Sequence, residues 1–185
     1  MVTQDPYLSE VFPEPPLTAF RRQKNIRDML IKSKVPTAPK IHPERKLKGM
    51  VKCVKSCTAC PFINVRKEVK IDNVSKWKIN KKFSCENYNI IYLIECNIDT
   101  CRERYVGQSK RPLKFHLGEH RGYVTNKVLN QPTGAHFNLP GHSLANLNIT
   151  ILEQAKRNNE QYRKERESYF IRKLNTFYKG MNRTK

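Results

Sequence analysis

Two tyrosines, two histidines and one glutamate between residues 92 and 167 have side chains that could together attack a phosphodiester. Tyr92 and Tyr105 each lie in a short apolar run, His116 and His120 are one helical turn apart, and Glu167 lies near the end of the chain. In-line attack by water needs a base, a cation on the developing charge and a held leaving group. A free phenol has a pKa of about 10, so it acts as a base only where nearby cations lower that pKa.

Glu167 is placed on the apolar side of an expected helix. Its helical neighbours at three, four and seven residues are Phe170, Ile171 and Leu174. A carboxylate on such a stripe is costly unless it is paired or binds a cation. The sequence therefore favours a cation ligand. The alternative is a glutamate at the edge of the stripe that is paired with Arg163 or Arg166.

His116 and His120 share one face of another expected helix with two leucines, Leu113 and Leu117. Imidazoles at this place could contact a phosphate or move protons. The alternative is a pair of histidines that are solvated or satisfied within the core.

The cysteines and two further histidines have the spacing of metal ligands. Cys57 and Cys60 form a C-x2-C pair, and His136 and His142 form an H-x5-H pair. These four residues predict one tetrahedral zinc site, because two thiolates at that spacing can reach one ion. The remaining thiols predict a possible second zinc site, with buried free thiols as the alternative: Cys53, Cys85, Cys96 and Cys101.

The charge of the chain points to a polyanionic partner. The chain has 36 Lys+Arg against 16 Asp+Glu, a formal net charge of +20. The excess is spread along the whole chain, which favours a long surface that follows a phosphate backbone over a separate basic tail. The alternative is a protein with many solvated lysines. No apolar run approaches the ~20 residues of a membrane span or resembles a secretory signal, so metal ligation is preferred over a disulfide framework.

Three strands and two helices are expected to position these residues. The sequence predicts strands at residues 90–94, buried on both faces, and at 104–107. A helix follows at 112–123, with Pro112 in its first turn. Residues 147–152 alternate and predict a strand with one solvated face, and 158–178 predict a charged helix.

The first half of the chain has a different composition. Residues 1–19 and 36–43 are rich in proline and predict extended connections, with a short helix between them that carries Ile26, Met29 and Leu30. Residues 51–88 are rich in lysine and poor in large apolar side chains, so a bound metal is expected to order them. The predicted divisions are a linker at 1–50, a zinc-binding segment at 51–88 and a domain at 89–185.

The order of the motifs resembles the GIY-YIG nuclease family. Ile90-Ile91-Tyr92 is similar to the first element, with isoleucine where the family has glycine, and Tyr105-Val106-Gly107 is similar to the second. The resemblance implies a small α/β (α+β) fold with a three-stranded antiparallel sheet flanked by helices. It also implies that Tyr92 or Tyr105 orients or deprotonates the water, and that Glu167 holds Mg2+ or Mn2+.

One position departs from the family at the centre of the site. The helix after the second motif usually presents an arginine to the phosphate, and His116 stands there in this chain. By resemblance, His116 with Arg111 would meet the phosphate, and His120 matches a family histidine. The arginine's role could also be taken by Arg111 or Arg121.

The cysteine pair before the first strand, with the two histidines inside the nuclease region, resembles the endonuclease of Penelope-like retrotransposons. Residues 12–20 and 25–33 look like the linker that follows their reverse transcriptase. The resemblance implies a nuclear DNA nickase whose 3' hydroxyl primes reverse transcription at the target. Its implied partners are DNA, an upstream reverse transcriptase of the same polyprotein and, as a further candidate, template RNA.

Two rival hypotheses remain open. The same fold could be a catalytically impaired nucleic-acid-binding module because of His116. A zinc-finger binder with no catalytic ancestry would instead leave Tyr92, Tyr105 and Glu167 far apart in space.

Overall fold

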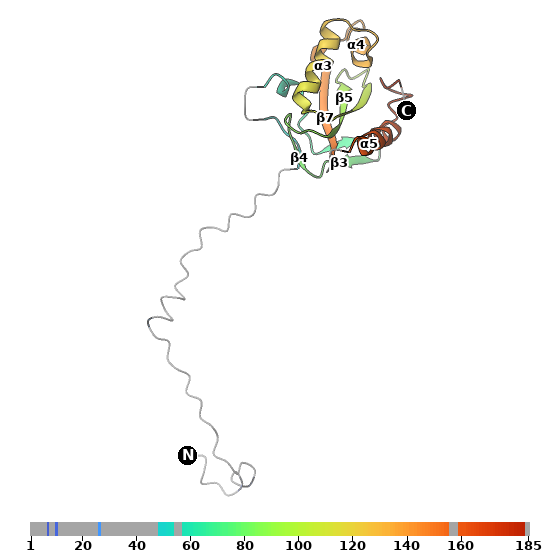
Figure 1. The fold of residues 1–185 in the computed structure, drawn as a ribbon. Coiled ribbons are helices and arrows are strands. Elements are labelled where there is room, and N and C mark those ends of the chain that lie inside the picture. The colour runs from blue at the N-terminus through green and yellow to red at the C-terminus, as the bar shows by residue number, and fades with distance from the viewer. Residues whose placement is uncertain are drawn as a thin grey trace. The chain divides into compact units, whose positions relative to one another are not determined.

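The computed structural model of the chain describes residues 48–53, 57–155 and 159–183, together with the single positions Tyr7, Glu10 and Ile26. The chain divides into two units, Met1–His42 and Pro43–Lys185 (Figure 1). The helix expected around Ile26 lies outside the described residues except for Ile26 itself, which is helical and exposed. The fold that follows is that of the second unit, which joins the predicted zinc-binding segment and the predicted nuclease domain.

The second unit is a mixed α/β fold. Its described elements follow one another as β1 (Gly49–Met50), η1 (Cys60–Phe62), β2 (Glu68–Lys70), β3 (Lys76–Lys78), β4 (Lys82–Phe83), β5 (Ile90–Cys96), β6 (Arg104–Ser109), α3 (Leu113–Thr125), α4 (Pro132–His136), η2 (Leu144–Asn146), β7 (Leu147–Gln154) and α5 (Glu160–Lys173). Three strands form an antiparallel sheet in the order β6-β5-β7. The prediction of a three-stranded antiparallel sheet flanked by helices is confirmed.

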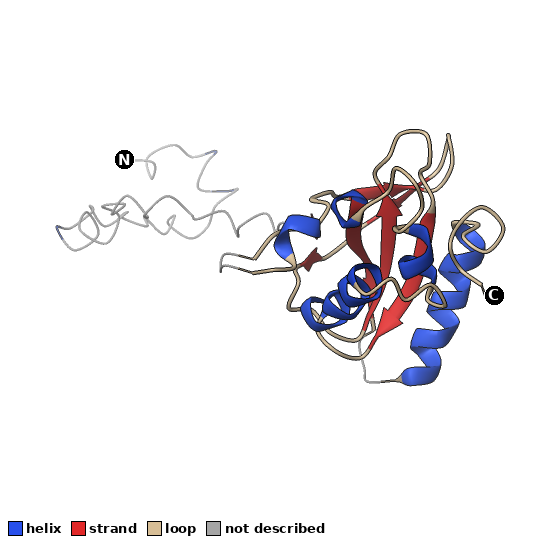
Figure 2. Ribbon diagram, turned by 90° about the horizontal axis from the view of Figure 1, so that it is seen from above, coloured by secondary structure: helices blue, strands red, loops and turns tan. Residues whose placement is uncertain are grey.

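The central strand β5 is apolar because both of its faces are covered. All of its residues except Glu95 are buried. Helices α3 and α5 lie on opposite sides of the sheet (Figure 2). Side chains alternate along a strand, so Tyr92 points to the α3 side while Leu93 points to the α5 side. None of the described helices combines the length and the apolar composition that a bilayer crossing requires.

Strand β7 differs from its prediction, since its second face is covered and not solvated. Thr150 on that face is fully buried. Ile63 pairs with Ile149 in a short parallel bridge, and the Asn64 amide donates to the Ile149 carbonyl at 3.0 Å. The Arg66 guanidinium donates to the Thr150 hydroxyl at 3.1 Å. The segment before the sheet therefore supplies the cover that the alternation of β7 could not reveal.

The segment before the sheet also contributes to the apolar core, although it has few large apolar residues. Its strands pair as β1 with β4, in parallel, and as β2 with β3, antiparallel. Several of its apolar side chains are buried in the core that also contains the sheet, among them Ile63, Val69, Ile79 and Phe83, together with Met50 just before it. Residues 51–88 therefore pack on the rest of the unit through ordinary apolar contacts as well as through their cysteines.

Candidate active site

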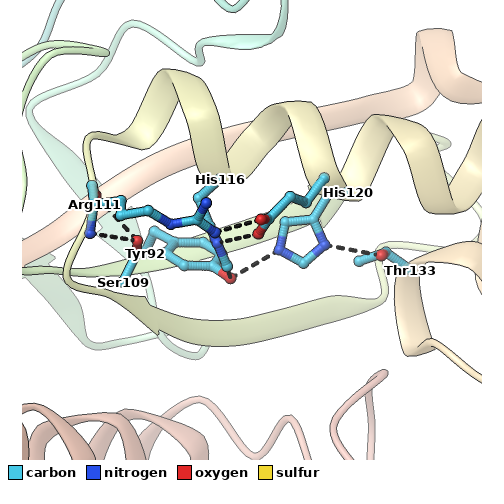
Figure 3. Close-up of polar contacts among 7 residues, drawn as sticks. Tyr92, Ser109, Arg111, His116, His120 and Thr133 are labelled. Carbon is cyan, nitrogen blue, oxygen red and sulfur yellow. Dashed lines mark hydrogen bonds and ion pairs between the residues drawn. The ribbon is translucent and has the colours of Figure 1, made fainter.

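A hydrogen-bonded cluster surrounds the phenol of Tyr92. The hydroxyl of this buried residue lies 2.7 Å from His116 Nε2 and 2.8 Å from His120 Nε2 (Figure 3). The Tyr105 ring lies beside them, with its centroid 6.4 Å from that of Tyr92 and 5.6 Å from that of His120. Two strands and one helix thus bring four of the predicted site residues together.

Gly107 has a steric role in this cluster. It lies directly across from Tyr92 in the β5–β6 register, and facing residues in antiparallel strands point to the same side of the sheet. A Cβ added at Gly107 would lie 2.6 Å from Tyr92 Cζ and 2.9 Å from the Tyr105 ring. Because Gly107 has no side chain, there is space at this position for both phenol rings.

The proton positions in the cluster follow from the partners of each ring. His120 Nδ1 lies 2.9 Å from the Thr133 hydroxyl, and His116 Nδ1 lies 2.8 Å from a Glu119 carboxylate oxygen. A protonated Nδ1 on His116 leaves its Nε2 to accept from the Tyr92 hydroxyl. His120 Nε2 then donates to the same hydroxyl, and its Nδ1 accepts from Thr133. This arrangement gives a donor and an acceptor to each contact of the Tyr92 and Thr133 hydroxyls.

The Glu119 carboxylate connects two predicted site residues. It pairs with the Arg111 guanidinium on one side and with the His116 ring on the other. The second contact is a close approach and not a well-directed hydrogen bond, because His116 Nδ1 has no hydrogen-bond partner among the described residues. Arg111 is thereby held beside the cluster, with its side chain more than half exposed. Glu119 was not predicted, although its position three residues after His116 was a usable signal.

Burial keeps the histidines neutral. It lowers the pKa of His120 to about 3, with a smaller contribution from neighbouring His116. It also lowers the pKa of His116, against the opposing effect of the Glu119 charge. At neutral pH both rings are therefore uncharged, and His116 brings no positive charge to the place where an arginine is expected.

Both phenols hold their protons tightly. Burial raises the pKa of Tyr105 to about 12, and the negative charge of Glu167 adds to this effect. Burial also raises the pKa of Tyr92, followed by the charges of Tyr105 and Glu167. These shifts are opposite to what a phenolate base needs, so the chain's own charges do not ionise either tyrosine at neutral pH.

Glu167 is the fifth member of the cluster. Its carboxylate is half-buried on α5 and is near enough to raise the pKa of both phenols. Burial raises its own pKa to about 7, while the Gln108 backbone N–H, which donates to it, acts in the opposite direction. We call Tyr92, Tyr105, His116, His120 and Glu167 the phenol cluster.

The arginines that could have paired with Glu167 have other partners. Arg166 contacts Glu153 at 2.6 Å, and Arg163 donates to Gln108 and to Asn89. Glu167 forms no ion pair with any residue that the structure describes. Its carboxylate is therefore available to a cation from outside the chain.

The edge strand that carries Tyr105 is held by Met181 and Asn182. The Asn182 amide accepts from Val106 N–H and donates to Val106 C=O, both at 2.8 Å. The Met181 N–H donates to Arg104 C=O at 2.8 Å. Asn182 was missed because nothing in its spacing from the other motifs points to it. It acts as a substitute for a neighbouring strand on a free sheet edge.

The eight predicted zinc ligands all lie in clusters, but they are grouped differently from the prediction. One group is Cys53, Cys57, Cys60 and Cys85, with ligand atoms within 4.8 Å of one another. We call it the four-cysteine cluster. The other, the mixed cluster, has the same compactness and consists of Cys96, Cys101, His136 and His142. Cys57 and Cys60 therefore do not join the two histidines, and the set of four leftover thiols is divided between the groups.

Strand pairing explains the four-cysteine cluster. β1 and β4 are parallel, with Met50 opposite Phe83. The residues that follow parallel strands emerge at the same end, so Cys53 and Cys85 meet there. The C-x2-C pair then closes the group, with Cys53 Sγ 3.2 Å from Cys60 Sγ. A pairing of two-residue strands leaves no readable pattern in the sequence.

The mixed cluster lies at the other end of the sheet. Cys96 ends β5, Cys101 lies in the turn to β6, and His136 ends α4. His136 Nε2 is 3.5 Å from Cys101 Sγ, and its Nδ1 is 3.3 Å from a Glu103 carboxylate oxygen. A carboxylate on the second ring nitrogen is the usual support of a metal-binding histidine.

The donor sets fit zinc. All six cysteines are free thiols. Burial acts to raise the pKa of Cys57, but hydrogen bonds from the Ala59 backbone and the neighbouring thiols outweigh it and lower this pKa to about 7. Four thiolates, or two thiolates with two imidazoles, are the ligand sets of structural zinc sites. The four-cysteine cluster could therefore bind a metal ion such as zinc.

Comparisons with models of protein families, with curated proteins and with solved structures gave no match to this chain.

Proposed function

We propose that the chain is a metal-dependent DNA endonuclease of the GIY-YIG type, which nicks DNA to leave a 3' hydroxyl for target-primed reverse transcription in a retroelement of the Penelope-like kind. The convergence of the phenol cluster carries this proposal. Five residues from β5, β6, α3 and α5 meet there, although Tyr92 and Glu167 are far apart in the sequence. The priming role and the upstream reverse transcriptase follow from the family resemblance alone.

Glu167 is the residue that would hold Mg2+ or Mn2+. Mg2+ is bound in proteins through one or two carboxylates, with water and substrate phosphate completing its shell. A half-buried carboxylate without an ion-pair partner among the described residues fits that requirement. The ion would supply positive charge at the phosphate and would lower the pKa of a nearby phenol.

Tyr105 is the better candidate for the base. Tyr105 is only partly buried, and Glu167 is the charged group that affects its pKa most, so a cation bound to Glu167 would act on Tyr105. Tyr92 is fully enclosed and its hydroxyl is occupied by both histidines. We therefore assign proton removal from the water to Tyr105. Tyr92 is assigned the role of holding the two histidines in place.

A binding module without catalysis is the second candidate. The observation that favours it is the neutral His116, which cannot stabilise phosphoryl charge as an arginine does. The exposed Arg111 forms an ion pair with Glu119, which contacts His116, so a guanidinium lies beside the cluster and could bind a phosphate without catalysis.

Nicking of a supercoiled plasmid with Mg2+ or Mn2+ tests the proposal. The parent chain should nick, and Glu167→Ala should lower the rate by at least ~100-fold. Glu165→Ala is the matched control, because Glu165 is exposed on the same helix, and it should nick as the parent does. Equal rates for both variants would refute the assigned site.

His116→Arg separates the two candidates. Nicking that appears only in this variant would make the parent a binding module disabled at one residue. Nicking by the parent that depends on Glu167 would show that a neutral histidine is tolerated at position 116.

The metal clusters are proposed to bind two structural Zn2+ ions. Metal analysis of the purified chain should give two zinc ions per chain, and Cys60→Ala and Cys101→Ala should each remove one. A single zinc that is lost in both variants would contradict two independent sites.

A further inference from the structure

The hairpin of β2 and β3 has two chemically different faces. The register places Val69 opposite Trp77, and both point toward the protein, with Val69 fully buried. The alternate residues point outward and are mostly basic: Glu68, Lys70, Lys76 and Lys78. No described element of the chain covers this outer face.

The hairpin is held firmly on the molecule. The Trp77 indole N–H donates to the Leu152 carbonyl at 3.0 Å. The Trp77 ring lies edge-on to that of Phe170, with centroids 4.9 Å apart, and Lys173 Nζ lies 5.0 Å from its centre. These contacts join the hairpin to β7 and α5, so its outer face has a fixed orientation. They also place it on the side of the sheet opposite α3 and the Tyr92 hydroxyl.

The outer face carries three lysines against one carboxylate, Glu68, which faces Lys78. Lys70 lies directly opposite Lys76, and like charges facing each other across strands are destabilising. Lys76 Nζ contacts Glu68 at 2.6 Å, but Lys70 and Lys78 form no ion pair with any described residue. A row of phosphates would relieve this repulsion. Three more exposed lysines flank the strands, namely Lys67, Lys81 and Lys82.

The tip of the hairpin is ordered and yet presents an apolar side chain. One Asp72 carboxylate oxygen accepts from the Val74 N–H at 2.8 Å and from the Ser75 N–H at 2.6 Å, and the Ser75 hydroxyl donates to the other oxygen at 2.5 Å. These bonds fix the turn. Val74 is nevertheless 93% exposed, so its apolar surface meets only water in the free protein.

We propose that this hairpin is a DNA-binding ribbon that enters the major groove of duplex DNA, with Lys70 and Lys78 on the phosphates and Val74 against the base edges. The proposal rests on the proposed function in naming DNA as the partner. The major groove of B-form DNA is wide enough for a two-stranded β-ribbon. The corresponding groove of duplex RNA is too deep and narrow for side chains to read. Because the ribbon lies on the face of the sheet opposite the Tyr92 hydroxyl and its two histidines, the ribbon contact is separate from that hydroxyl.

Binding of the intact chain to a short fluorescent DNA duplex, without added Mg2+ or Mn2+, tests the ribbon. Lys70→Gln with Lys78→Gln should weaken binding by roughly tenfold and reduce the slope of log K against log salt by about 2, since each phosphate contact contributes about 0.9. The matched control is Lys127→Gln with Lys179→Gln, two exposed lysines outside the hairpin. The control pair should change both quantities much less.

Val74→Ser gives a second, independent readout. It should lower the affinity for DNA and leave the salt slope unchanged, because it removes an apolar contact and no charge. Its side chain is exposed, so thermal unfolding should not change. An unchanged affinity would overturn the assignment of Val74 to the groove.

Four outcomes decide the proposal. Equal losses in the two lysine pairs would overturn it, because the effect would be one of net charge. Equal hairpin-dependent affinity for duplex RNA of the same sequence would overturn the assignment to the major groove of DNA. Glu167-dependent nicking with undiminished binding of the hairpin variants would sustain the nuclease and refute the ribbon. Hairpin-dependent binding without any nicking would sustain the ribbon and refute the nuclease.

Discussion

The phenol cluster and the four-cysteine cluster are assembled in opposite ways. The phenol cluster stands on the three-stranded sheet, where Tyr92, Ile94 and Val106 are almost fully buried. The four-cysteine cluster stands beside two-residue strands, β1 and β4, whose pairing contains few hydrogen bonds. The first group is positioned by apolar packing before any ligand arrives. The second depends much more on what its four thiols bind.

Within one unit, one site is ordered by apolar packing, and the other is expected to depend on metal binding. The apolar core fixes the phenols through steric contacts that persist whether or not a cation is bound. The cysteine region has only two-residue strands beside its thiols, so a bound metal is expected to supply much of its order. Loss of zinc should therefore loosen residues 48–86 while the sheet keeps its packing.

Loss of a zinc ligand should give the largest effect. In Cys60→Ala the Val51 N–H, which donates to Phe83 C=O at 2.8 Å, should lose about 3 kcal/mol or more of protection from hydrogen exchange. The basis is that structural zinc contributes about 10–16 kcal/mol in zinc-finger peptides. Amides of β5 should stay protected. Cys101→Ala is the control from the mixed cluster, and it should leave Val51 unchanged. An equal loss of hydrogen-exchange protection at Val51 and throughout β5 would show that the two regions do not differ in their dependence on zinc.

Overpacking beside the phenols should have the next largest effect. Gly107→Ala would force a methyl group against the Tyr92 ring and should cost about 2–3 kcal/mol of unfolding free energy, as overpacked cores do. It should also abolish nicking, because Tyr92 and Tyr105 would be displaced. The measurements are chemical denaturation and the plasmid assay.

Gly118→Ala is the control for this substitution. No atom lies within 4 Å of a Cβ at Gly118, and alanine is favoured over glycine within a helix by up to about 1 kcal/mol. It should therefore stabilise the protein and preserve activity. A Gly107→Ala protein that is as stable and as active as the parent would show that the phenols are not sterically fixed.

The sequence revealed the phenol cluster more fully than the four-cysteine cluster. Strands β5 and β6 and helix α3 could be predicted because their apolar periodicity is strong and local. Glu167 could be placed because a carboxylate on an apolar stripe is unusual. The grouping of the cysteines could not be predicted, since it depends on the parallel pairing of β1 with β4. Asn182 likewise becomes visible only once the sheet edge that it covers is known.

The ionisation of Glu167 should make stability depend on pH. Burial raises its pKa from the ordinary 4.5 to about 7, so the folded state holds the proton more tightly than the unfolded state. The stability that results is present in full below about pH 4.5 and is lost as the pH rises through 7. Glu167→Gln stays neutral and should therefore exceed the parent by about 1 kcal/mol at pH 8, after allowance for partial exposure. At pH 4 the two proteins should be alike.

Cation binding should reduce that difference. Mg2+ or Mn2+ bound to Glu167 offsets the cost of the buried charge, so either ion should stabilise the parent at pH 8 and leave Glu167→Gln unchanged. Urea unfolding at both pH values measures each effect. Glu165→Gln, at the exposed position on the same helix, should show neither. A gap between Glu167→Gln and the parent that is the same at pH 4 and pH 8 would mean that ionisation is not its cause.

The last expected effect concerns the hydroxyl that orients His120. Thr133 is almost fully buried and its hydroxyl lies 2.9 Å from His120 Nδ1. Thr133→Val keeps the shape but leaves that ring nitrogen without its partner, which should cost about 1–2 kcal/mol. Thr176 offers the matched control, because it is fully buried and its hydroxyl has no hydrogen-bond partner among the described residues. Thr176→Val should therefore be neutral or stabilising. If the two valine variants lost equal stability, the loss would come from the size of the side chain and not from the orientation of His120, and the proton arrangement assigned to the phenol cluster would have no support from stability.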